Sequence, residues 1–379
     1  MTITYFSNFI NHHQVHLSDE LYKLTGGNFT FVEMIPMPCW LKNSGYPDYT
    51  SRPYVLQVWK NNENLKKAEE LAESADIMLI GANEALKYEV KRAKYSNKII
   101  IEVSERWFKK GMINLFSPRL IKWLYYYHTL FWKKNVYKLC AGAYTSYDMK
   151  LLHAFNGRCF KWGYFTYVND WDLRQHNENK IIKIMWCARF ITWKHPELVI
   201  KLAANLKKAG YSFIINMYGS GEKFDTMLSL VNNLHLNDVI NLRGNLPNHL
   251  IHNAMREHQI FLFTSDRNEG WGAVANEALS NGCALVGSDK IGSIPFLIKD
   301  GVNGCVFKSG NLNSLTEKTK WLIDNPDIRK SIAKSGYNTI KIHWSPKNAA
   351  RNLLLLINDL KSTKGTSITE GPCSNVSTF

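Results

Sequence analysis

Two glutamates, Glu269 and Glu277, are the residues whose spacing most clearly suggests chemistry, in the run TSDRNEGWGAVANEAL. The residues that follow Glu269 are Gly270, Trp271, Gly272 and Ala273, at a strand-to-helix turn, and a helix is predicted over 271–281. Glycines there let backbone N–H groups approach a ligand, and the start of a helix favours an anion. The helix would carry Glu277 roughly 9 Å along its axis from the turn. We therefore expect the carboxylates to hold the two hydroxyl-bearing ends of a nucleotide-sugar, unless Glu269 only caps the helix and Glu277 is exposed.

Two cations, Arg189 and Lys194, lie in a second run, WCARFITWKHPEL, which follows a strand-like segment. Doubly wound folds make phosphate contacts at such strand ends. Arginine suits bidentate contact with a phosphate, and lysine acts as a point charge. The run therefore predicts a diphosphate site, with two solvated surface cations as the alternative. Loops after two further strand-like runs add weaker donor-binding candidates at Gly219, Asn245 and Leu246.

Alternating strands and helices must bring these residues to one edge of a sheet. The second half of the chain predicts strands at 181–187, 212–218, 239–242, 259–264, 284–287 and 304–307, with helices between them. The first half predicts strands at 3–7, 29–35, 54–58, 76–81 and 98–104, with weaker strands at 143–146 and 158–162. Helices between strands imply parallel sheets covered on both faces.

The predicted organisation is two Rossmann-like, doubly wound α/β domains that face each other across a cleft. The N-terminal, acceptor-binding domain covers 1–165, a polar linker covers 166–180, and the C-terminal, nucleotide-sugar-binding domain covers 181–345. A helix at 346–361 is able to pack back on the first domain, and the polar tail 362–379 is predicted to be disordered.

Composition restricts the class of protein. The chain has 379 residues and a formal net charge of +15, which suggests an anionic partner. Its seven cysteines are scattered without CxxC spacing, so neither a zinc site nor a disulfide framework is indicated, and reduced thiols fit a cytoplasmic location. No signal peptide and no run of 18 apolar residues is visible, which argues against a spanning helix.

With these residues in place, the sequence resembles the retaining glycosyltransferases of family 4, which have the GT-B fold. Their E-x7-E signature corresponds to Glu269 and Glu277, and their phosphate-binding pair to Arg189 and Lys194. The later run IGSIPFLIKDGVNGCVFKSGN also matches the family, and the resemblance is strongest over residues 181–345.

The resemblance implies roles for these residues. Glu269 would hydrogen-bond the donor sugar and Glu277 the nucleotide ribose, while Arg189 and Lys194 would hold the diphosphate of a UDP- or GDP-sugar. Cations that stabilise the leaving diphosphate make a metal unnecessary, so we expect neither metal nor cofactor. A DxD sequence, Asp170-Trp171-Asp172, lies in the predicted linker and not at a strand end, which disfavours a metal role.

The acceptor side is expected in the first half, where the family's glycine-rich loop is replaced by NFINHHQ. His12 or His13 could bond an acceptor hydroxyl or the donor phosphate, or simply cap a helix. Glu105 follows another strand and could face the cleft or pair with Arg106 or a nearby lysine.

The segment 106–138 is rich in basic and aromatic residues and has no acidic residue. This mixture is typical of an element in an anionic membrane surface, and also of single-strand nucleic acid stacking or of a core helix with a basic rim. The membrane interpretation is favoured, and no nucleic-acid partner is expected. The candidate membrane contacts are Trp107, Lys109, Lys110, Trp123, Trp132, Lys133 and Lys134.

The sequence thus predicts a metal-independent, retaining glycosyltransferase with a glycan or lipid-linked acceptor. The expected pathway is surface polysaccharide synthesis, as in capsule or lipopolysaccharide assembly, at the inner face of the cytoplasmic membrane. The alternatives are a sugar-nucleotide epimerase of the same fold and a non-catalytic, basic membrane- or nucleic-acid-binding protein.

Overall fold

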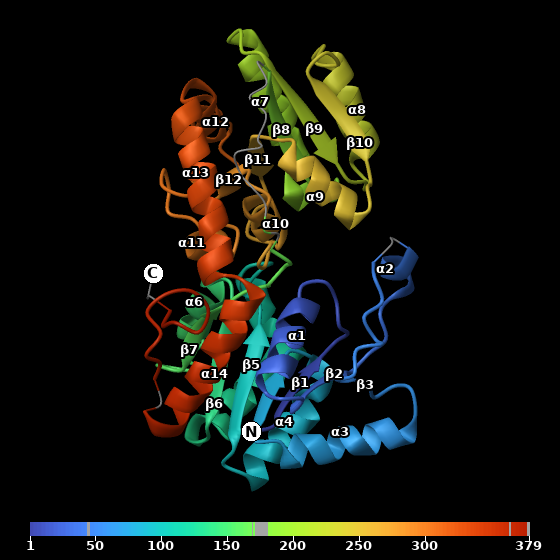
Figure 1. Cartoon of the computed structure of the whole chain (residues 1–379), viewed down its shortest axis with the longest axis vertical. Coiled ribbons are helices and arrows are strands. Elements are labelled where there is room, and N and C mark those ends of the chain that lie inside the picture. The colour runs from blue at the N-terminus through green and yellow to red at the C-terminus, as the bar shows by residue number, and fades with distance from the viewer. Residues whose placement is uncertain (44–45, 169, 171–180, 364, 377–379) are drawn as a thin grey trace. The chain divides into compact units, whose positions relative to one another are not determined.

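The computed structural model describes residues 1–43, 46–168, 170, 181–363 and 365–376 (Figure 1). It divides the chain into two compact units. The first contains residues 1–167 together with 343–379, and the second contains 168–342.

The first unit is built on a seven-stranded parallel sheet with strand order β3-β2-β1-β4-β5-β6-β7. The order reverses between β1 and β4, which is the point where a doubly wound sheet opens a crevice at the strands' carboxyl ends. The strands are β1 (Ile3–Ser7), β2 (Phe29–Glu33), β3 (Val55–Gln57), β4 (Ile77–Ile80), β5 (Ile99–Ser104), β6 (Val136–Ala141) and β7 (Cys159–Trp162).

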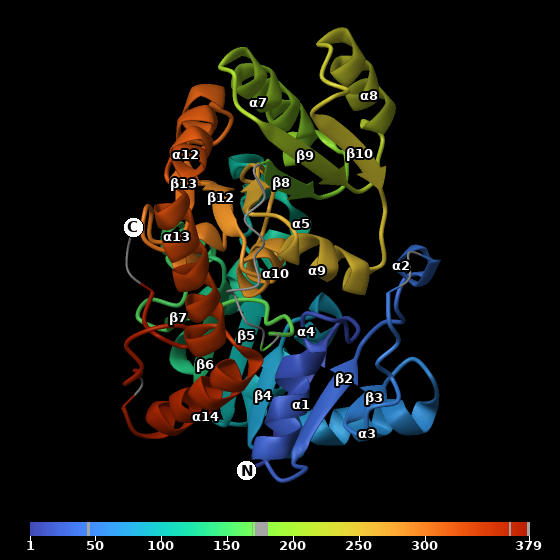
Figure 2. The same ribbon diagram turned by 45° about the horizontal axis from the view of Figure 1, so that its top comes forward.

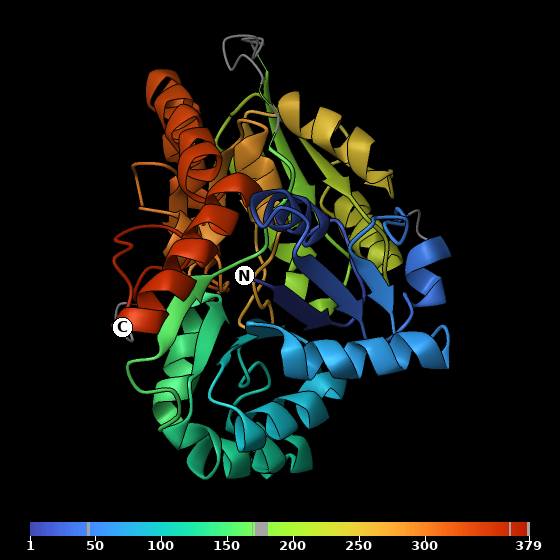
Figure 3. The ribbon, with the colours of Figure 1, turned by 60° about the horizontal axis from the view of Figure 1, so that its bottom comes forward.

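Helices cover both faces of this sheet, and every residue of β1 and of the apolar β4 is buried. Figure 3 shows α3 and α4 on one side of the strands and α1 with α14 on the other. The helices are α1 (Val15–Leu24), α2 (Cys39–Asn43), α3 (Asn62–Ser74), α4 (Leu86–Tyr95), α5 (Pro118–His128), α6 (Ala143–Leu151) and α14 (Pro346–Ser362), with short 3-10 turns η1 (Asn83–Ala85), η2 (Met112–Phe116) and η3 (Phe131–Lys133).

The prediction of a strand at 143–146 is wrong. These residues begin α6, and the strand precedes them as β6. Lys138 in the middle of β6 concealed it from the sequence, since a charged residue is rare in a buried strand. The structure neutralises that charge with the carboxylate of Glu102, whose Oε2 lies 2.6 Å from Lys138 Nζ. Gly142, with φ of +110°, turns the chain from β6 into α6.

The tail is also not disordered, as far as the structure describes it. Backbone bonds join Lys161 N to Ser374 O and Cys373 N to Lys161 O, so the tail packs along β7. Asn352 of α14 donates to the carbonyl of Pro372, and Cys373 is fully buried. These hydrogen bonds and the burial of Cys373 order the tail despite the polar composition that predicted disorder.

The second unit is built on a six-stranded parallel sheet with order β10-β9-β8-β11-β12-β13, which reverses between β8 and β11. Its strands are β8 (Ile182–Cys187), β9 (Phe213–Tyr218), β10 (Ile240–Gly244), β11 (Ile260–Phe263), β12 (Ala284–Ser288) and β13 (Cys305–Phe307). Its helices are α7 (Pro196–Lys208), α8 (Phe224–Asn233), α9 (Asn248–Arg256), α10 (Val274–Ser280), α11 (Ile294–Leu297), α12 (Leu312–Asp324) and α13 (Pro326–Asn338), with a 3-10 turn η5 (Thr192–Lys194) and a π-helical turn (Thr339–His343).

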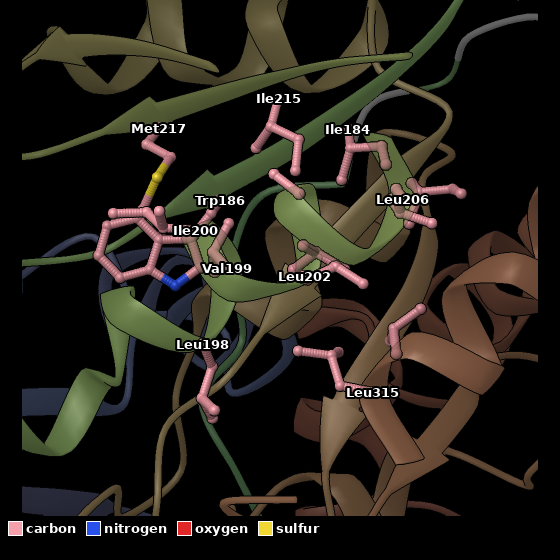
Figure 4. Packing of buried hydrophobic residues seen from close by; sticks show 14 of the residues in the cluster. Ile184, Trp186, Leu198, Val199, Ile200, Leu202, Leu206, Ile215, Met217 and Leu315 are labelled. Atoms are coloured by element: carbon pink, nitrogen blue, oxygen red, sulfur yellow. The ribbon is translucent and has the colours of Figure 1, made fainter. Parts of the chain in front are cut away.

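In this unit α7 and α8 lie beside β8–β10, and α12 and α13 lie beside β12 and β13 (Figure 2). The core under α7 joins strand residues such as Trp186, Ile215 and Met217 to Leu202 and Leu206 of the helix (Figure 4). Pro196 starts α7, where its missing N–H costs little. All seven cysteines are free thiols.

Candidate functional site

The switch point of the second sheet brings the ends of β8 and β11 together, and with them the two runs that the sequence singles out. Lys194 Nζ forms an ion pair with Glu269 Oε2. The two side chains are only 12% and 11% exposed. A cation and a carboxylate from loops 75 residues apart therefore meet at the strand ends, where ligands of this fold bind.

Thr264 links the backbone of Lys194 to the buried side chain of Trp186. Its hydroxyl donates to the carbonyl of Lys194 at 2.6 Å and accepts from the indole N–H of Trp186 at 2.9 Å. Thr264 and Trp186 are almost fully buried. The main chain of Lys194 is therefore tied to both β8 and β11, which limits the freedom of the ammonium group.

His195, which follows Lys194, makes a further side-chain contact between the loop after β8 and the loop after β11. It adopts φ of +52°, which is uncommon outside glycine, before α7. Its Nδ1 lies 2.9 Å from Glu197 Oε1 and its Nε2 3.2 Å from Asp266 Oδ2. The hydrogen bond to Glu197, together with the charges of both carboxylates, raises the pKa of His195 above its usual value, although burial opposes the rise.

The glycine loop after β9 packs directly against the loop after β8. Phe190 N donates to Ser220 O at 2.8 Å, and Lys223 N donates to Phe190 O at 2.9 Å. Gly219 has φ of +131°, and a Cβ there would lie 1.9 Å from the carbonyl oxygen of Ala188. This close approach to the Ala188 carbonyl by itself requires glycine at position 219, and donor contact at Gly219 stays a prediction.

The turn between the two glutamates differs from expectation. The α-helix begins at Val274 and not at Trp271, and α10 has only seven residues. The side chain of Trp271 is fully buried and donates to Asn276 Oδ1 at 2.8 Å, so only its backbone is available to a ligand. Gly272 has φ of +81°, and a Cβ there would lie 2.4 Å from the ring of Phe263. Ala273 is largely buried.

Glu277 lies near the end of β8 and is 7% exposed, not exposed as the simpler alternative required. Its Oε1 is 3.8 Å from His252 Nε2 on α9. Burial raises the pKa of the Cys187 thiol to about 12, and the nearby Glu277 carboxylate adds to the rise. A carboxylate held at this strand end is suited to accept hydrogen bonds from hydroxyl groups.

The other predicted donor-site residues are less enclosed. Arg189 is exposed, with its guanidinium 5.9 Å from the ring centre of Trp193, and it is not joined to the Lys194–Glu269 pair. Asn245 donates to Ser220 Oγ at 2.7 Å, so it braces the glycine loop. Leu246 is 38% exposed.

The first unit has its own cavity, of about 650 Å³, at the carboxyl ends of β1, β4 and β5. His13 and Glu105 line it, whereas His12 is not among its lining residues. Glu105 accepts a hydrogen bond from the hydroxyl of Tyr164 at 2.8 Å and forms an ion pair with Lys109, not with Arg106.

The two histidines lie side by side, with ring centres 3.7 Å apart. His13 N–H donates to the side chain of Asn11, and its ring stacks on that of Tyr164. The loop that replaces the glycine-rich loop is therefore an ordered turn that places one histidine at the cavity wall.

The segment 106–138 is not a single surface element. Trp123 is buried at 6% exposure, so its prediction as a membrane contact is wrong: it packs edge-on to Trp107 under α5. Trp107, Lys109 and Lys110 line the cavity. Of the remaining candidates, Trp132 and Lys133 are exposed, and Lys134 is half-buried and bonded to Asn97.

The outer side of the same segment carries large exposed apolar side chains: Met112, Ile113, Phe116, Ile121, Tyr125 and Trp132. Exposed basic residues, Lys122 and Lys133, accompany them. Among the helices that the structure describes, none combines the length and apolarity that crossing a membrane demands.

The DxD sequence lies largely outside the described residues, since only Asp170 is placed. Its side chain is 85% exposed and forms an ion pair with Lys341 at 2.6 Å.

Sequence reasoning missed Thr264, His195 and Asp266, which hold the pair in place. Two features of the sequence indicate these residues: a histidine directly before the proline that starts a helix, and polar residues immediately after a buried strand.

Comparison with known proteins agrees with this geometry. Residues 170–339 match the family described as glycosyl transferases group 1. An uncharacterized glycosyltransferase of Methanocaldococcus jannaschii is 26% identical over 183 residues, 48% of this chain and 46% of the relative. The N-acetyl-alpha-D-glucosaminyl L-malate synthase of Bacillus anthracis is 24% identical over 124 residues, 33% of this chain and 32% of the relative. The matches thus span less than half of either relative's length.

Solved structures show the same fold. The crystal structure of Anabaena HepE in complex with UDP has a TM-score of 0.71 at 12% identity, and the match covers 95% of this chain and 100% of that chain.

Proposed function

The chain belongs to the group 1 glycosyl transferases through residues 170–339 and has the GT-B fold, and from this premise we propose that it is a glycosyltransferase. It would move a hexosyl group from a nucleotide-sugar, with UDP or GDP as the nucleotide, to a glycan or lipid-linked acceptor, with retention of configuration. The observation that carries the proposal is the Lys194–Glu269 ion pair at the switch point of the second sheet.

The donor would lie across this switch point. Lys194 and Arg189 are proposed to hold the diphosphate, and Glu277 the ribose hydroxyls. Glu269 neutralises Lys194 in the structure as it stands. On binding, the diphosphate would share the ammonium group, and the Glu269 carboxylate would turn to hydroxyls of the donor sugar. The exposed side chain of Arg189 leaves it free to move to the second phosphate.

The proposed reaction is a displacement on one face of the sugar. The acceptor hydroxyl oxygen forms the bond to the anomeric carbon as the bond from that carbon to the diphosphate oxygen breaks. The acceptor proton passes to the departing diphosphate, so no enzyme nucleophile is required. Cations held at the strand ends stabilise the growing negative charge of the leaving group more in the transition state than in the ground state. We propose that this charge makes a metal unnecessary.

We also propose that the protein associates peripherally with an anionic membrane surface through the outer side of residues 106–138. The exposed apolar side chains on η2 and α5, together with Lys122 and Lys133, support this. An acceptor on a lipid carrier would be reached there, which fits a role in surface polysaccharide synthesis at the inner face of the cytoplasmic membrane.

Titration calorimetry of the full chain with UDP, GDP, ADP and CMP, each with and without EDTA, tests the donor site. We expect one nucleotide to bind, EDTA to have no effect, and Glu277→Gln to weaken binding about tenfold or more, since it replaces a charge-assisted hydrogen bond with a neutral one.

Glu257→Gln is the matched control, because Glu257 ends α9 in the same unit but its side chain is 68% exposed. Equal losses in both variants, or binding of none of the four nucleotides, would refute the proposed donor site. The matching nucleotide-sugar, supplied with candidate acceptors, then tests transfer itself.

A further inference from the structure

The cavity of the first unit has a wall whose charge the proposed donor chemistry does not use. At about 650 Å³ it is large enough for a sugar with a substituent, and it opens at the β1/β4 switch point. Four of its cations come from one stretch of chain, and they are Arg106, Lys109, Lys110 and Arg119; a fifth, Lys138, is paired with Glu102.

Two of these cations are already neutralised. Arg106 Nη2 lies 3.1 Å from Oδ1 of the buried Asp148, and Lys109 pairs with Glu105. Lys110 and Arg119 form no ion pair with any residue that the structure describes. The guanidinium of Arg119 instead lies 5.6 Å from the ring centre of Trp107, which holds it at the wall.

The first turn of α5 adds backbone donors at the same wall. Ser117, Arg119 and Leu120 line the cavity. The first turn has no acidic residue, and the Ser117 side chain does not cap it. The earliest intrahelical bond runs from Ile121 N to Ser117 O, so the N–H groups of Arg119 and Leu120 precede the hydrogen-bonded part of this 11-residue helix. Such N–H groups favour an anion.

The remaining surface suits a sugar. The side chains of Asn8, Asn83 and Ser104 line the cavity and are able to hydrogen-bond sugar hydroxyls. The aromatic rings at the wall are already packed, since Tyr164 stacks on His13 and Trp123 packs edge-on to Trp107. The floor is held rigid because Glu102 Oε2 accepts hydrogen bonds from both Lys138 and Tyr127, at 2.6 and 2.9 Å. One cavity thus combines hydrogen-bonding side chains with a localised positive charge that no described carboxylate neutralises.

We propose that this cavity binds a phosphorylated acceptor sugar, whose phosphoryl group is held by Lys110, Arg119 and the first-turn N–H groups of α5. The proposal rests on the proposed glycosyltransferase function and specifies its acceptor. The phosphoryl group could belong to a lipid carrier or to a soluble sugar phosphate, because the wall would recognise either.

Binding to the full chain tests this directly. The probes are glucose 1-phosphate, glucose, and phosphatidylcholine vesicles with and without a polyprenyl phosphate. We expect wild type to bind at least one phosphorylated probe and to bind glucose more weakly. The double variant Lys110→Ala/Arg119→Gln should lose about tenfold or more in affinity, since two charge-assisted contacts are removed.

The matched control is Lys66→Ala/Lys67→Ala, which removes the same charge from exposed residues of α3 that neither line the cavity nor belong to the proposed membrane surface. It should leave binding of glucose 1-phosphate unchanged. Binding of glucose 1-phosphate assigns the phosphoryl group to a soluble sugar, and binding of the polyprenyl phosphate vesicles alone assigns it to a lipid carrier.

Equal losses in the two double variants, or no preference for phosphorylated probes over glucose and plain vesicles, would overturn the proposal. UDP and GDP binding, measured on the same preparations, should be unchanged in both variants, because their residues lie outside the donor unit. A failure of the proposed donor site would appear in that second measurement, separately from a failure of the acceptor proposal.

Discussion

Replacing Glu89 by glutamine should stabilise the protein at neutral pH, and the gain should grow with pH. Glu89 lies on α4 with no exposed surface. Burial raises the pKa of its carboxyl well above the usual value, and repulsion by Glu102 adds to this, while Lys138 opposes it. Tyr127, which bonds Glu102, contributes no positive charge. Between its unfolded pKa and its raised native pKa, the native protein therefore keeps a proton on Glu89 that the unfolded chain releases.

The magnitude follows from this difference in bound protons. A group whose native pKa is raised contributes stability below its unfolded pKa, and that contribution is lost as pH rises toward the native pKa. For Glu89 the loss starts near pH 4.5. It amounts to about 1.4 kcal/mol per pH unit for as long as the native carboxyl keeps its proton. Glutamine imitates the protonated form at every pH, so its advantage should grow with pH at up to this rate until the native carboxyl ionises.

Urea unfolding of the full chain at several pH values between 5 and 8, followed by tryptophan fluorescence and circular dichroism, measures the difference between Glu89→Gln and wild type. Glu84→Gln is the control, because Glu84 is exposed just before the same helix and should show no such trend. Glu102→Gln should act in the opposite direction, by about 3–5 kcal/mol, because it leaves the buried Lys138 without its partner. A pH-independent effect of Glu89→Gln, or destabilisation at pH 8, would refute the reasoning.

Three further predictions concern the loops and the tail. Gly219→Ala should lower the melting temperature by several degrees and weaken nucleotide binding, because its Cβ would strike the Ala188 carbonyl. Gly310→Ala, where φ is +71° and the space around the Cβ is open, should cost only about 1 kcal/mol of backbone strain, and equal costs would contradict the clash. Asparagine tolerates the positive φ of His195, so His195→Asn removes the imidazole without backbone strain. The variant should lower the melting temperature most at pH 6, and its difference from wild type should vanish as pH rises through the raised His195 pKa. A constant difference between pH 6 and pH 9 would exclude a stabilising role for the protonated imidazole. Deleting residues 366–379 should destabilise the first unit, seen as faster hydrogen exchange in β7, because it removes the backbone bonds between Lys161 and residues 373–374. Unchanged exchange in this deletion would show that the tail bonds contribute nothing.

The two doubly wound sheets could be predicted from the sequence, because buried parallel strands are continuous apolar runs separated by helical ones. Strands β4 and β11 consist entirely of apolar residues. β6 was missed because its charged Lys138 is compensated by Glu102 from a strand 36 residues earlier, and such a partner cannot be read locally. The same limit applies to the tail, whose order depends on bonds to β7 and α14.

In the candidate site, residue types could be predicted better than contacts. The sequence placed Glu269 and Lys194 at strand ends, and the structure joins them. The sequence could not reveal that Trp123 is buried while the adjacent Lys122 is exposed. The pattern of a short amphipathic helix does not identify the element that packs against its apolar face. The start of α10 was predicted too early because Trp271 is apolar enough to extend a helical pattern, although its side chain is occupied by Asn276.

The first unit is assembled from both ends of the chain, with α14 packed against α1 and residue 374 bonded to β7. On the ribosome, the segment 168–342 therefore emerges complete while the first unit still lacks its last helix. The second unit is able to fold during synthesis, whereas the first unit cannot be completed until residue 374 has left the exit tunnel. During that interval the face of the sheet that α14 later covers is exposed, and it is the surface that a chaperone would be expected to protect.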